Sequence, residues 1–379
     1  MLRNLHFDLS LAFAFILLIS IGVLLIYSAT TVPNIFSNKD PYIYIKKELF
    51  FSFFAFIVMI VAYLTPIEFW KKYAYYITVI TIILLILVLF FYVELKGKSV
   101  RRWLNLGIVR FQPSELAKFT IVLFFAKYIS RKEKVLNSWY GITVPLIVVS
   151  IFVYLILKEP HNGGAIFIAL ISILLMLSFK FDLKKIIPLF TIGAGLLAFS
   201  VYNVEYARYR LLAFLNPLEH RTDISYQIVQ ALISFVKGGW FGEGLGAGSQ
   251  KFKYLPEIQT DYIFALIGEE FGVIGCIFIL SIFLFILYKG IKISINLEDK
   301  FSQVLGVGIT YVIVLQALLH FAVNLNIFPA TGITLPFVSY GGTSLIIMSL
   351  MAGILLRLSK EPKKVFVLKK SRSRRRYVR

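Results

Sequence analysis

Hydrophobic residues occur along this chain in long, nearly uninterrupted runs, and polar residues gather between the runs. A helix needs about 20 apolar residues to cross the hydrocarbon core of a bilayer. Runs of that kind number about ten, and they centre on residues 9–30, 49–65, 74–93, 113–129, 141–157, 164–179, 186–202, 262–288, 301–323 and 338–357. The pattern predicts an all-α polytopic membrane protein with about ten transmembrane helices.

The longest interruption, residues 203–260, separates the seventh and eighth runs and predicts a large loop. Residues 226–236 alternate apolar and polar positions as an amphipathic helix at a bilayer surface does. A glycine-rich segment follows at residues 238–248; it lacks the Gly-Lys-Ser/Thr ending of an ATP-binding loop. Two interpretations of this segment stay open, a flexible loop that approaches a substrate and a structural turn.

Composition supports the membrane assignment, since 59% of the residues are hydrophobic and 36 are Phe. The single cysteine, Cys276, excludes a disulfide framework and a cysteine-based metal site. Lys and Arg number 40 against 20 Asp and Glu. Because no nucleic-acid-binding motif accompanies this charge, we expect anionic membrane lipid as the partner and no nucleic acid.

The basic residues also predict an orientation, because short cytoplasmic loops retain Lys and Arg. The strongly basic tail, residues 361–379, is expected in the cytoplasm, after a transmembrane domain that spans residues 1–360. The N-terminal run lacks a convincing cleavage site, so it is expected to be a retained first span. Ten spans then place both termini in the cytoplasm and make residues 203–260 extracytoplasmic.

One loop breaks this rule, because residues 96–118 carry Lys98, Arg101 and Arg102 on the predicted outer side. A wrong topology is one explanation. The other is a basic cluster that binds an anionic group such as a lipid diphosphate, which Arg grips through two parallel hydrogen bonds. Glu115 and Lys118 form either an i,i+3 ion pair or a functional group of intramembrane charges.

Carboxylates surround the start of the eighth run in the stretch YLPEIQTDYIFALIGEEFG. Asp261 either caps this helix or does chemistry at the membrane surface. Glu269 and Glu270 lie deeper and mark either a buried polar network or a transport path. Glu159 and His161 are two further candidate polar residues, and they lie in the turn between the fifth and sixth runs.

Several motifs together resemble one family. They are IYSA at the end of the first run, RRWLNLG followed by QPSELAK, SYQIVQALISF, GLGAGSQK, YLPEIQTDYIFALIGEE and TLPFVSYGGTSL. In this order they resemble the SEDS family of bacterial cell-wall polymerases, which includes FtsW, RodA and SpoVE. The resemblance extends from the first run to the last, and its details favour the FtsW and SpoVE branch over RodA.

The resemblance implies a peptidoglycan glycosyltransferase that polymerises lipid II, an undecaprenyl-diphosphate disaccharide-peptide, at the outer face of the cytoplasmic membrane. Asp261 matches the essential aspartate of the family and is the predicted general base of an inverting transfer. Arg102 and Lys118 are the predicted diphosphate contacts. The other predicted substrate-binding residues are Glu115, Glu257, Lys98, Arg101, Glu159 and Ser339. A divalent cation, Mg²⁺ or Mn²⁺, bound by Asp261 or Glu257 stays open.

One segment departs from the family. Many members read Gln-Pro-Asp-Leu-Gly-Thr-Ala where this chain reads EPHNGGA at residues 159–165. The role of the missing aspartate is therefore not assigned to His161, and Glu159 is its candidate replacement.

The family also implies a partner, a class B penicillin-binding protein that cross-links the new glycan. Two other functions stay open. A lipid II flippase would use the basic loop and Glu269–Glu270 as a passage, whereas a scaffold that recruits the transpeptidase would leave Asp261 dispensable.

Overall fold

The protein is described by a computed structural model that covers residues 8–36, 38, 40–92, 102–105, 107, 110–179, 181–182, 184–185, 187, 195, 205–217, 223–252 and 255–361. Its principal helices are α1 (Leu9–Phe36), α2 (Ile43–Leu64), α3 (Ile67–Phe90), α4 (Pro113–Lys132), α5 (Trp139–Lys158), α6 (Asn162–Ser178), α8 (Glu205–Leu215), α9 (Asp223–Gly238), α10 (Ile263–Ile295), α11 (Lys300–Asn324) and α12 (Gly342–Leu358). A two-stranded hairpin, β1 (Leu104–Asn105) and β2 (Arg110–Phe111), precedes α4, and the short helix η2 (Glu133–Val135) follows it.

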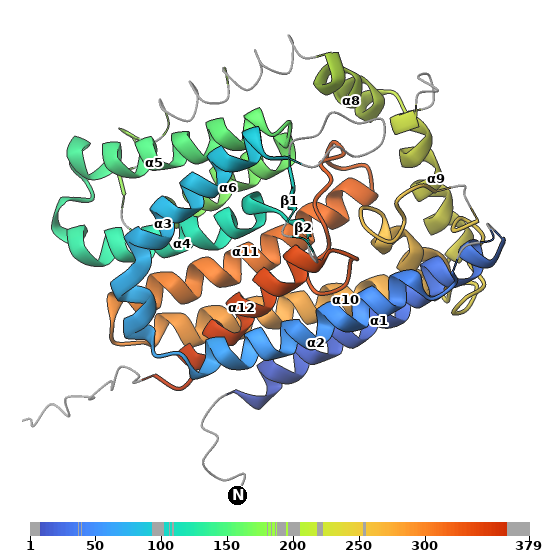
Figure 1. Ribbon diagram of the computed structural model, residues 1–379, viewed down its shortest axis with the longest axis horizontal. Helices are drawn as coiled ribbons and strands as arrows, with labels where there is room; N and C mark the ends of the chain where they lie inside the picture. The colour runs from blue at the N-terminus through green and yellow to red at the C-terminus, as the bar shows by residue number, and fades with distance from the viewer. Residues whose placement is uncertain are drawn as a thin grey trace, which may run out of the picture.

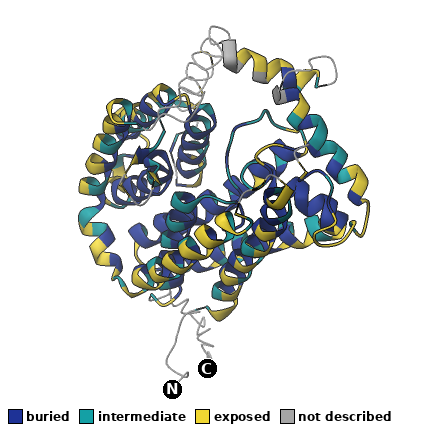
Figure 2. Cartoon of the chain, turned by 45° about the vertical axis from the view of Figure 1, so that its right-hand side comes forward, coloured by how far each residue is buried: buried dark blue, intermediate teal, exposed yellow. Residues whose placement is uncertain are grey.

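The long helices form one bundle with α11 at its centre (Figure 1). In this view α1 and α2 run along one edge, α3 to α6 form a second group, and α10 to α12 lie between them. α11 contacts α4, α6, α10 and α12, and its apolar part is 83% buried within the protein. Exposed residues lie mainly on the outward faces of the peripheral helices (Figure 2). The central helices therefore form a scaffold whose polar side chains are shielded from lipid.

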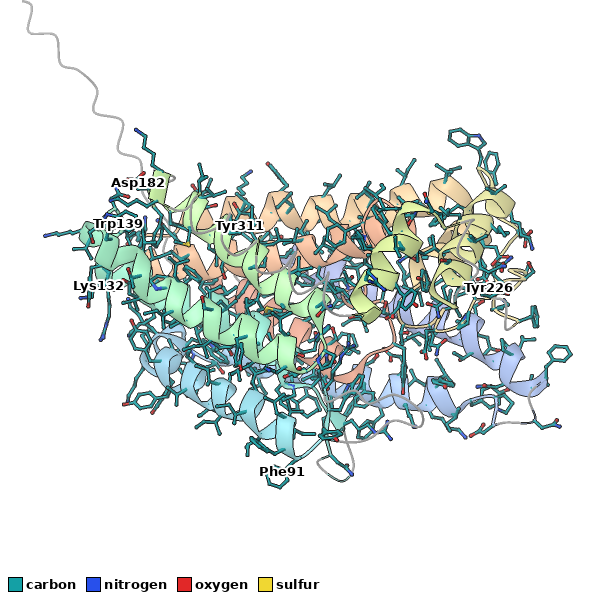
Figure 3. The ribbon with its side chains drawn as sticks, turned by 90° about the horizontal axis from the view of Figure 1, so that it is seen from above. Phe91, Lys132, Trp139, Asp182, Tyr226 and Tyr311 are labelled. Atoms are coloured by element: carbon teal, nitrogen blue, oxygen red, sulfur yellow. The ribbon has the colours of Figure 1, made fainter. Side chains whose placement is uncertain are left out.

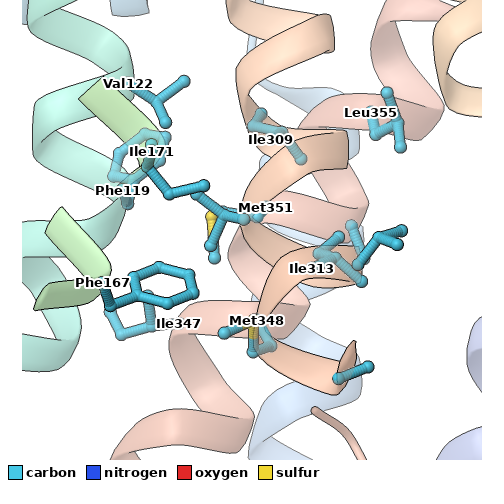
Figure 4. Close-up of a cluster of buried hydrophobic side chains, with 14 of the residues drawn as sticks. Phe119, Val122, Phe167, Ile171, Ile309, Ile313, Ile347, Met348, Met351 and Leu355 are labelled. Atoms are coloured by element: carbon cyan, nitrogen blue, oxygen red, sulfur yellow. The ribbon is translucent and has the colours of Figure 1, made fainter. Parts of the chain in front are cut away.

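Side chains from four helices pack in the middle of the bundle (Figure 4). Phe119 of α4, Phe167 of α6, Ile313 of α11 and Met351 of α12 are all buried in this cluster. Their dense van der Waals contacts fix the spacing of α4, α6 and α11, which support the candidate site.

The described part of the chain contains six helices that are long and apolar enough to span a membrane: α1, α2, α3, α5, α10 and α11. α6 and α12 are shorter apolar helices. The prediction of a helical, polytopic membrane protein is confirmed, whereas the number ten is not established, because most of the predicted span 186–202 lies outside the described residues. α2 and α3 begin six and seven residues before their predicted starts, at Ile43 and Ile67.

The predicted span 262–288 contains a break. Gly272 of α10 has φ 67° and ψ −163°, and the glycine-rich segment pairs with the backbone on both sides of it. Glu243 N donates to Glu269 O at 2.9 Å, and Val273 N donates to Gly239 O at 2.9 Å. These bonds replace helical bonds that the break removes. The glycine-rich segment is therefore a structural element of the bundle, and a Cβ on Gly242 would lie 2.2 Å from Glu270 O.

Two features were not predicted. α8 lies in the large loop before α9, and the β1–β2 hairpin pairs Leu104 with Phe111 immediately before α4. α9 includes the predicted amphipathic segment 226–236. Figure 3 shows α8 and α9 at the end of the bundle opposite Trp139 and Lys132.

Candidate functional site

The segment from Thr331 to Gly341 links α11 to α12, and we call it the central loop. α11 holds one side of it through side chains one turn apart. His320 Nδ1 lies 2.8 Å from Ile333 O, and Gln316 Nε2 donates to Thr334 O at 2.9 Å. The loop is thereby fixed against the most buried helix of the bundle.

Asp261 lies where the central loop meets α10. Its side chain is partly exposed, and its Oδ2 atom lies 3.7 Å from the position that a Cβ on Gly332 would occupy. α10 begins at Ile263 with Tyr262 as its N-cap, so Asp261 stands just before the helix and not at its cap position. The positive end of the helix dipole faces this carboxylate.

Two hydrogen bonds to backbone oxygens connect the Asp261 turn to the central loop. Ser339 Oγ donates to Thr260 O at 2.7 Å, and Tyr340 N donates to Gln259 O at 2.9 Å. Ser339 is only 4% exposed and also accepts from Leu335 N. The structure therefore places the predicted substrate contact Ser339 beneath the surface, where it positions the turn that carries Asp261.

Glu115 and Lys118 form a buried ion pair at the start of α4. Lys118 Nζ lies 2.7 Å from Glu115 Oε1, donates to Gln316 Oε1 at 2.8 Å, and lies 5.3 Å from the centre of the Phe167 ring. Lys118, a predicted diphosphate contact, is 1% exposed, so the structure places it inside the bundle and not at an exposed anion site. Gln316 in turn donates to Thr334 O in the central loop, so the pair holds that loop in place through Gln316.

Arg102 contacts the turn between α5 and α6. Its Nε atom donates to Glu159 O at 3.3 Å, and its Nη2 atom donates to Pro160 O. From the other side, Ser114 Oγ lies 3.3 Å from His161 Nδ1. Gly163 then packs on Thr331, because a Cβ at this glycine would lie 2.6 Å from the Thr331 side chain. The turn thus connects Arg102 with the central loop and, through Gly332, with Asp261.

The Glu159 carboxyl group is completely buried. Neither oxygen has hydrogen-bond geometry with a described residue, although Ser114 and Arg102 lie close enough to affect it. Burial raises the pKa of Glu159 to about 8, an effect that Ser114 and the Arg102 charge reduce without cancelling. The side chain is therefore mainly protonated at neutral pH.

Glu269 and Glu270 belong to a closed polar network. Glu269 Oε1 accepts from Ser249 N at 2.8 Å, while Glu270 Oε1 lies 2.8 Å from Lys251 Nζ and accepts from Ser28 Oγ at 2.6 Å. Lys251 and Glu270 have fully buried side chains. Of the two interpretations of these glutamates, the structure supports a buried network that ties α1 to Ser249 and Lys251, which follow the glycine-rich segment.

Sequence reasoning missed the polar side chains of α11. Gln316, His320 and Asn324 stand four residues apart and face the central loop and the Asp261 turn, and Asn324 Nδ2 donates to Asp261 O at 2.9 Å. Each is a single polar residue in an apolar helix, and only their shared spacing could have marked them as one stripe.

Some predicted residues do not join this group. Lys98 and Arg101 lie outside the described residues. Glu257 is exposed at the start of the Asp261 turn, where its carbonyl oxygen accepts from Asp261 N at 3.0 Å. No cluster of three His, Cys, Asp or Glu side chains occurs in the part of the chain that the structure describes. Within the described residues Asp261 and Glu257 do not belong to an all-protein cage for a cation, and no step is assigned to one.

Comparison with known proteins agrees with this arrangement. The sequence model of the cell cycle protein family of FtsW, RodA and SpoVE matches residues 8–364. The chain belongs to this family. Among FtsW/RodA/SpoVE members, it is 34% identical over 355 residues to the probable peptidoglycan glycosyltransferase FtsW of Geobacter sulfurreducens (strain ATCC 51573 / DSM 12127 / PCA), covering 93% of this chain and 95% of the relative. It is 35% identical over 369 residues to the protein of the same name from Francisella salina, covering 95% and 90%.

Solved structures of the FtsW/RodA/SpoVE family share the fold. A chain from a study of how a peptidoglycan synthase complex coordinates polymerization and crosslinking superposes with a TM-score of 0.78 at 21% identity, covering 95% of this chain and 98% of that one. The rod shape determining protein RodA of Thermus thermophilus gives 0.68 at 21% identity, covering 93% and 97%. The higher identity to proteins named FtsW agrees with the branch predicted from the motifs.

Proposed function

We propose that this protein is a peptidoglycan glycosyltransferase that polymerises lipid II at the outer face of the cytoplasmic membrane. The observation that carries the proposal is that three parts of the site meet at the central loop. They are the Asp261 turn, the α5–α6 turn that Arg102 contacts, and Gln316, which binds Lys118 of the Glu115–Lys118 pair. Relatives that cover nearly the whole chain are named as glycosyltransferases of this kind, which supports the same activity.

The chemistry assigns a role to each group. The 4-hydroxyl oxygen of the acceptor sugar attacks the anomeric carbon of the donor, and the bond from that carbon to the diphosphate oxygen breaks. Asp261 accepts the hydroxyl proton, and the electron pair of the broken bond leaves on the lipid diphosphate. Arg102 stabilises the leaving diphosphate through charge-assisted hydrogen bonds. Attack opposite the leaving group converts an α linkage into a β-1,4 linkage.

The other residues of the site position Asp261 and Arg102. The Glu115–Lys118 pair and Gln316 fix the central loop, and Ser339 and Asn324 fix the backbone on either side of Asp261. Preorganised polar groups in a site of this kind lower the barrier because they need not reorient during the reaction. Glu257, which is exposed, is assigned to contact the headgroup. Lys98 and Arg101 keep their predicted role in substrate binding.

The orientation belongs to the same proposal. Both termini lie in the cytoplasm and the Asp261 turn faces outward, because the basic residues of the tail and of several short loops then share the cytoplasmic side. In a Cys276→Ser background, Asp40→Cys should react with a membrane-impermeant thiol reagent on intact cells. Asn137→Cys should react only after permeabilisation, and the reverse pattern would invert the topology.

Two partners complete the proposal. A class B penicillin-binding protein cross-links the new strand, and anionic lipid binds the basic cytoplasmic tail. A chain of the same fold was solved in a study of a peptidoglycan synthase complex, which supports the first partner. Transport is less well supported, because Glu269 and Glu270 bind Ser249 and Lys251 in a buried network and do not line a passage among the described residues.

The decisive experiment measures glycan strands formed from purified lipid II by this protein with its cognate transpeptidase. Asp261→Asn should abolish polymer while leaving the complex intact, and Asp40→Asn, which removes an exposed surface carboxylate, should have no effect. Equal polymer from wild type and Asp261→Asn would remove Asp261 from the mechanism. No polymer from the wild-type complex would favour the lipid-flipping alternative.

A further inference from the structure

We propose that Glu159 is a positioning residue of the Arg102 anion site and that its carboxyl group takes up a proton when a diphosphate binds there. This inference rests on the proposed function for the class of ligand. Glu159 would then couple a proton to anion binding at this site.

The geometry places a charge next to an unpaired acid. Arg102 donates to the backbone oxygens of Glu159 and Pro160, so its guanidinium lies on the same turn as the Glu159 side chain. The carboxyl group is 0% exposed, and neither oxygen has hydrogen-bond geometry with any described residue. Arg102 is thus close enough to act on the carboxyl group but is held by backbone oxygens of the turn.

Few other described groups act on Glu159. From α4, Ser114 faces it, and the Ser114 hydroxyl also meets His161 Nδ1 at the start of α6. Lys158 at the end of α5 lies 5.5 Å from the Tyr154 ring centre, and Lys118 is paired with Glu115. Arg102 is therefore the charge that acts on Glu159 among the described residues.

Anion binding changes the balance between the two forms of the acid. A diphosphate on Arg102 neutralises the positive charge that favours the carboxylate, and in a buried site this loss is poorly screened. The protonated form then becomes more stable, and the reverse must also hold: protonation of Glu159 must tighten diphosphate binding. Loss of the proton from Glu159 would lower the affinity of the Arg102 site for the product diphosphate.

The pH range of the effect follows from the raised pKa. Without ligand the pKa of Glu159 is about 8, and bound anion raises it further. Well below this value the group is protonated in both states, so binding takes up no proton. At and above it, uptake should appear and affinity should fall with rising pH, by at most about tenfold per pH unit for one proton.

Isothermal titration calorimetry of the full-length purified protein with farnesyl diphosphate tests whether Glu159 takes up a proton when a diphosphate binds. The measurement at about pH 8.5, well above the phosphate ionisation near 6, is repeated in two buffers of different ionisation enthalpy. Wild type should take up a substantial fraction of one proton. Glu159→Gln should take up none and should bind with an affinity that is nearly independent of pH. His161→Gln, a matched control on the same turn, should retain the uptake.

The outcomes separate this inference from the proposed function. Binding by wild type without proton uptake would overturn the role of Glu159 and leave the glycosyltransferase standing, and that result needs no variant to fold. Uptake that persists in Glu159→Gln but disappears in His161→Gln would assign the proton to His161 instead. Binding unaffected by Arg102→Gln would overturn the anion site and this inference with it.

Discussion

Asn324 Nδ2 donates a hydrogen bond to the carbonyl oxygen of Asp261 at 2.9 Å, and Asn324 Oδ1 accepts one from Ala265 N at 3.1 Å. One buried amide from α11 therefore holds the catalytic candidate and the first turn of α10 together. This relationship makes Asn324 a positioning residue, since it contacts the backbone of Asp261.

Asn324→Leu should lower kcat with little change in KM. The substitution keeps the size of the side chain but removes the donor to Asp261 O and so frees the Asp261 segment, whereas Ala265 N keeps its bond to Tyr262 O at 3.0 Å. We expect polymerisation to slow by about tenfold or more. Asn296→Leu, which removes an exposed bond to Lys292 O at the other end of α10, is the control. An unchanged kcat in Asn324→Leu would show that Asp261 is held by other contacts.

Removing one partner of the Glu115–Lys118 pair should destabilise the protein more than removing both. Lys118→Met leaves a buried carboxylate uncompensated, which costs about 3–5 kcal/mol. Glu115→Gln combined with Lys118→Met should recover part of that loss in thermal unfolding of the detergent-solubilised protein. Lys300→Met, which breaks the more exposed contact with Glu133, should cost about 1 kcal/mol or less. Additive losses in the double variant would contradict a coupled pair.

Alanine at Gly272 should be far more damaging than alanine at Gly239. Both glycines have positive φ, 67° and 52°. Alanine at Gly239 adds about 1–2 kcal/mol of backbone strain, and alanine at Gly272 adds more because its ψ of −163° lies in a region that essentially only glycine populates. A Cβ at Gly239 meets nothing within 4 Å, whereas one at Gly272 would lie 2.5 Å from Trp240 O. Equal melting temperatures of the two variants would indicate that the glycine-rich segment does not pack on the break.

Acid should weaken the ion pair between Asp8, which precedes α1, and Lys289 of α10. Burial alone would raise the pKa of Asp8, but hydrogen bonds from Lys289, Ser10 and Leu11 outweigh it and lower the pKa below 3.8. The resulting stability is present above the unfolded value and is lost as pH falls through the lower folded value. Wild type should therefore lose stability relative to Asp8→Asn as pH falls below about 4. Parallel pH curves for the two proteins would contradict this.

The hydrophobic pattern predicted most of the helices because the lengths of the apolar runs are set by the bilayer. It misplaced the starts of α2 and α3 because Lys46, Glu48 and Glu68 interrupt the runs while the helices continue through them. The break at Gly272 left no signal either, since a glycine within an apolar run does not reveal its φ.

Site residues that belong to a sequence motif could be predicted, whereas those defined by contacts between helices could not. Asp261 stood out at the start of an apolar run, Arg102 stood out in a basic loop on the predicted outer side, and both match motifs of the family. The burial of Lys118 and Ser339, the unpaired state of the Glu159 carboxyl group and the bond from Asn324 to Asp261 depend on contacts between helices distant in sequence. Such contacts arise only when the bundle closes around α11.

The pairing of the glycine-rich segment with the break in α10 uses main-chain atoms, and this has an evolutionary consequence. Trp240, Phe241 and Leu245 are 68%, 82% and 53% exposed although the backbone around them is fixed. Mutations at these three positions can therefore accumulate at little cost to folding. The loop offers a rigid frame with interchangeable side chains, on which related proteins can diversify their surfaces while the reaction centre stays intact.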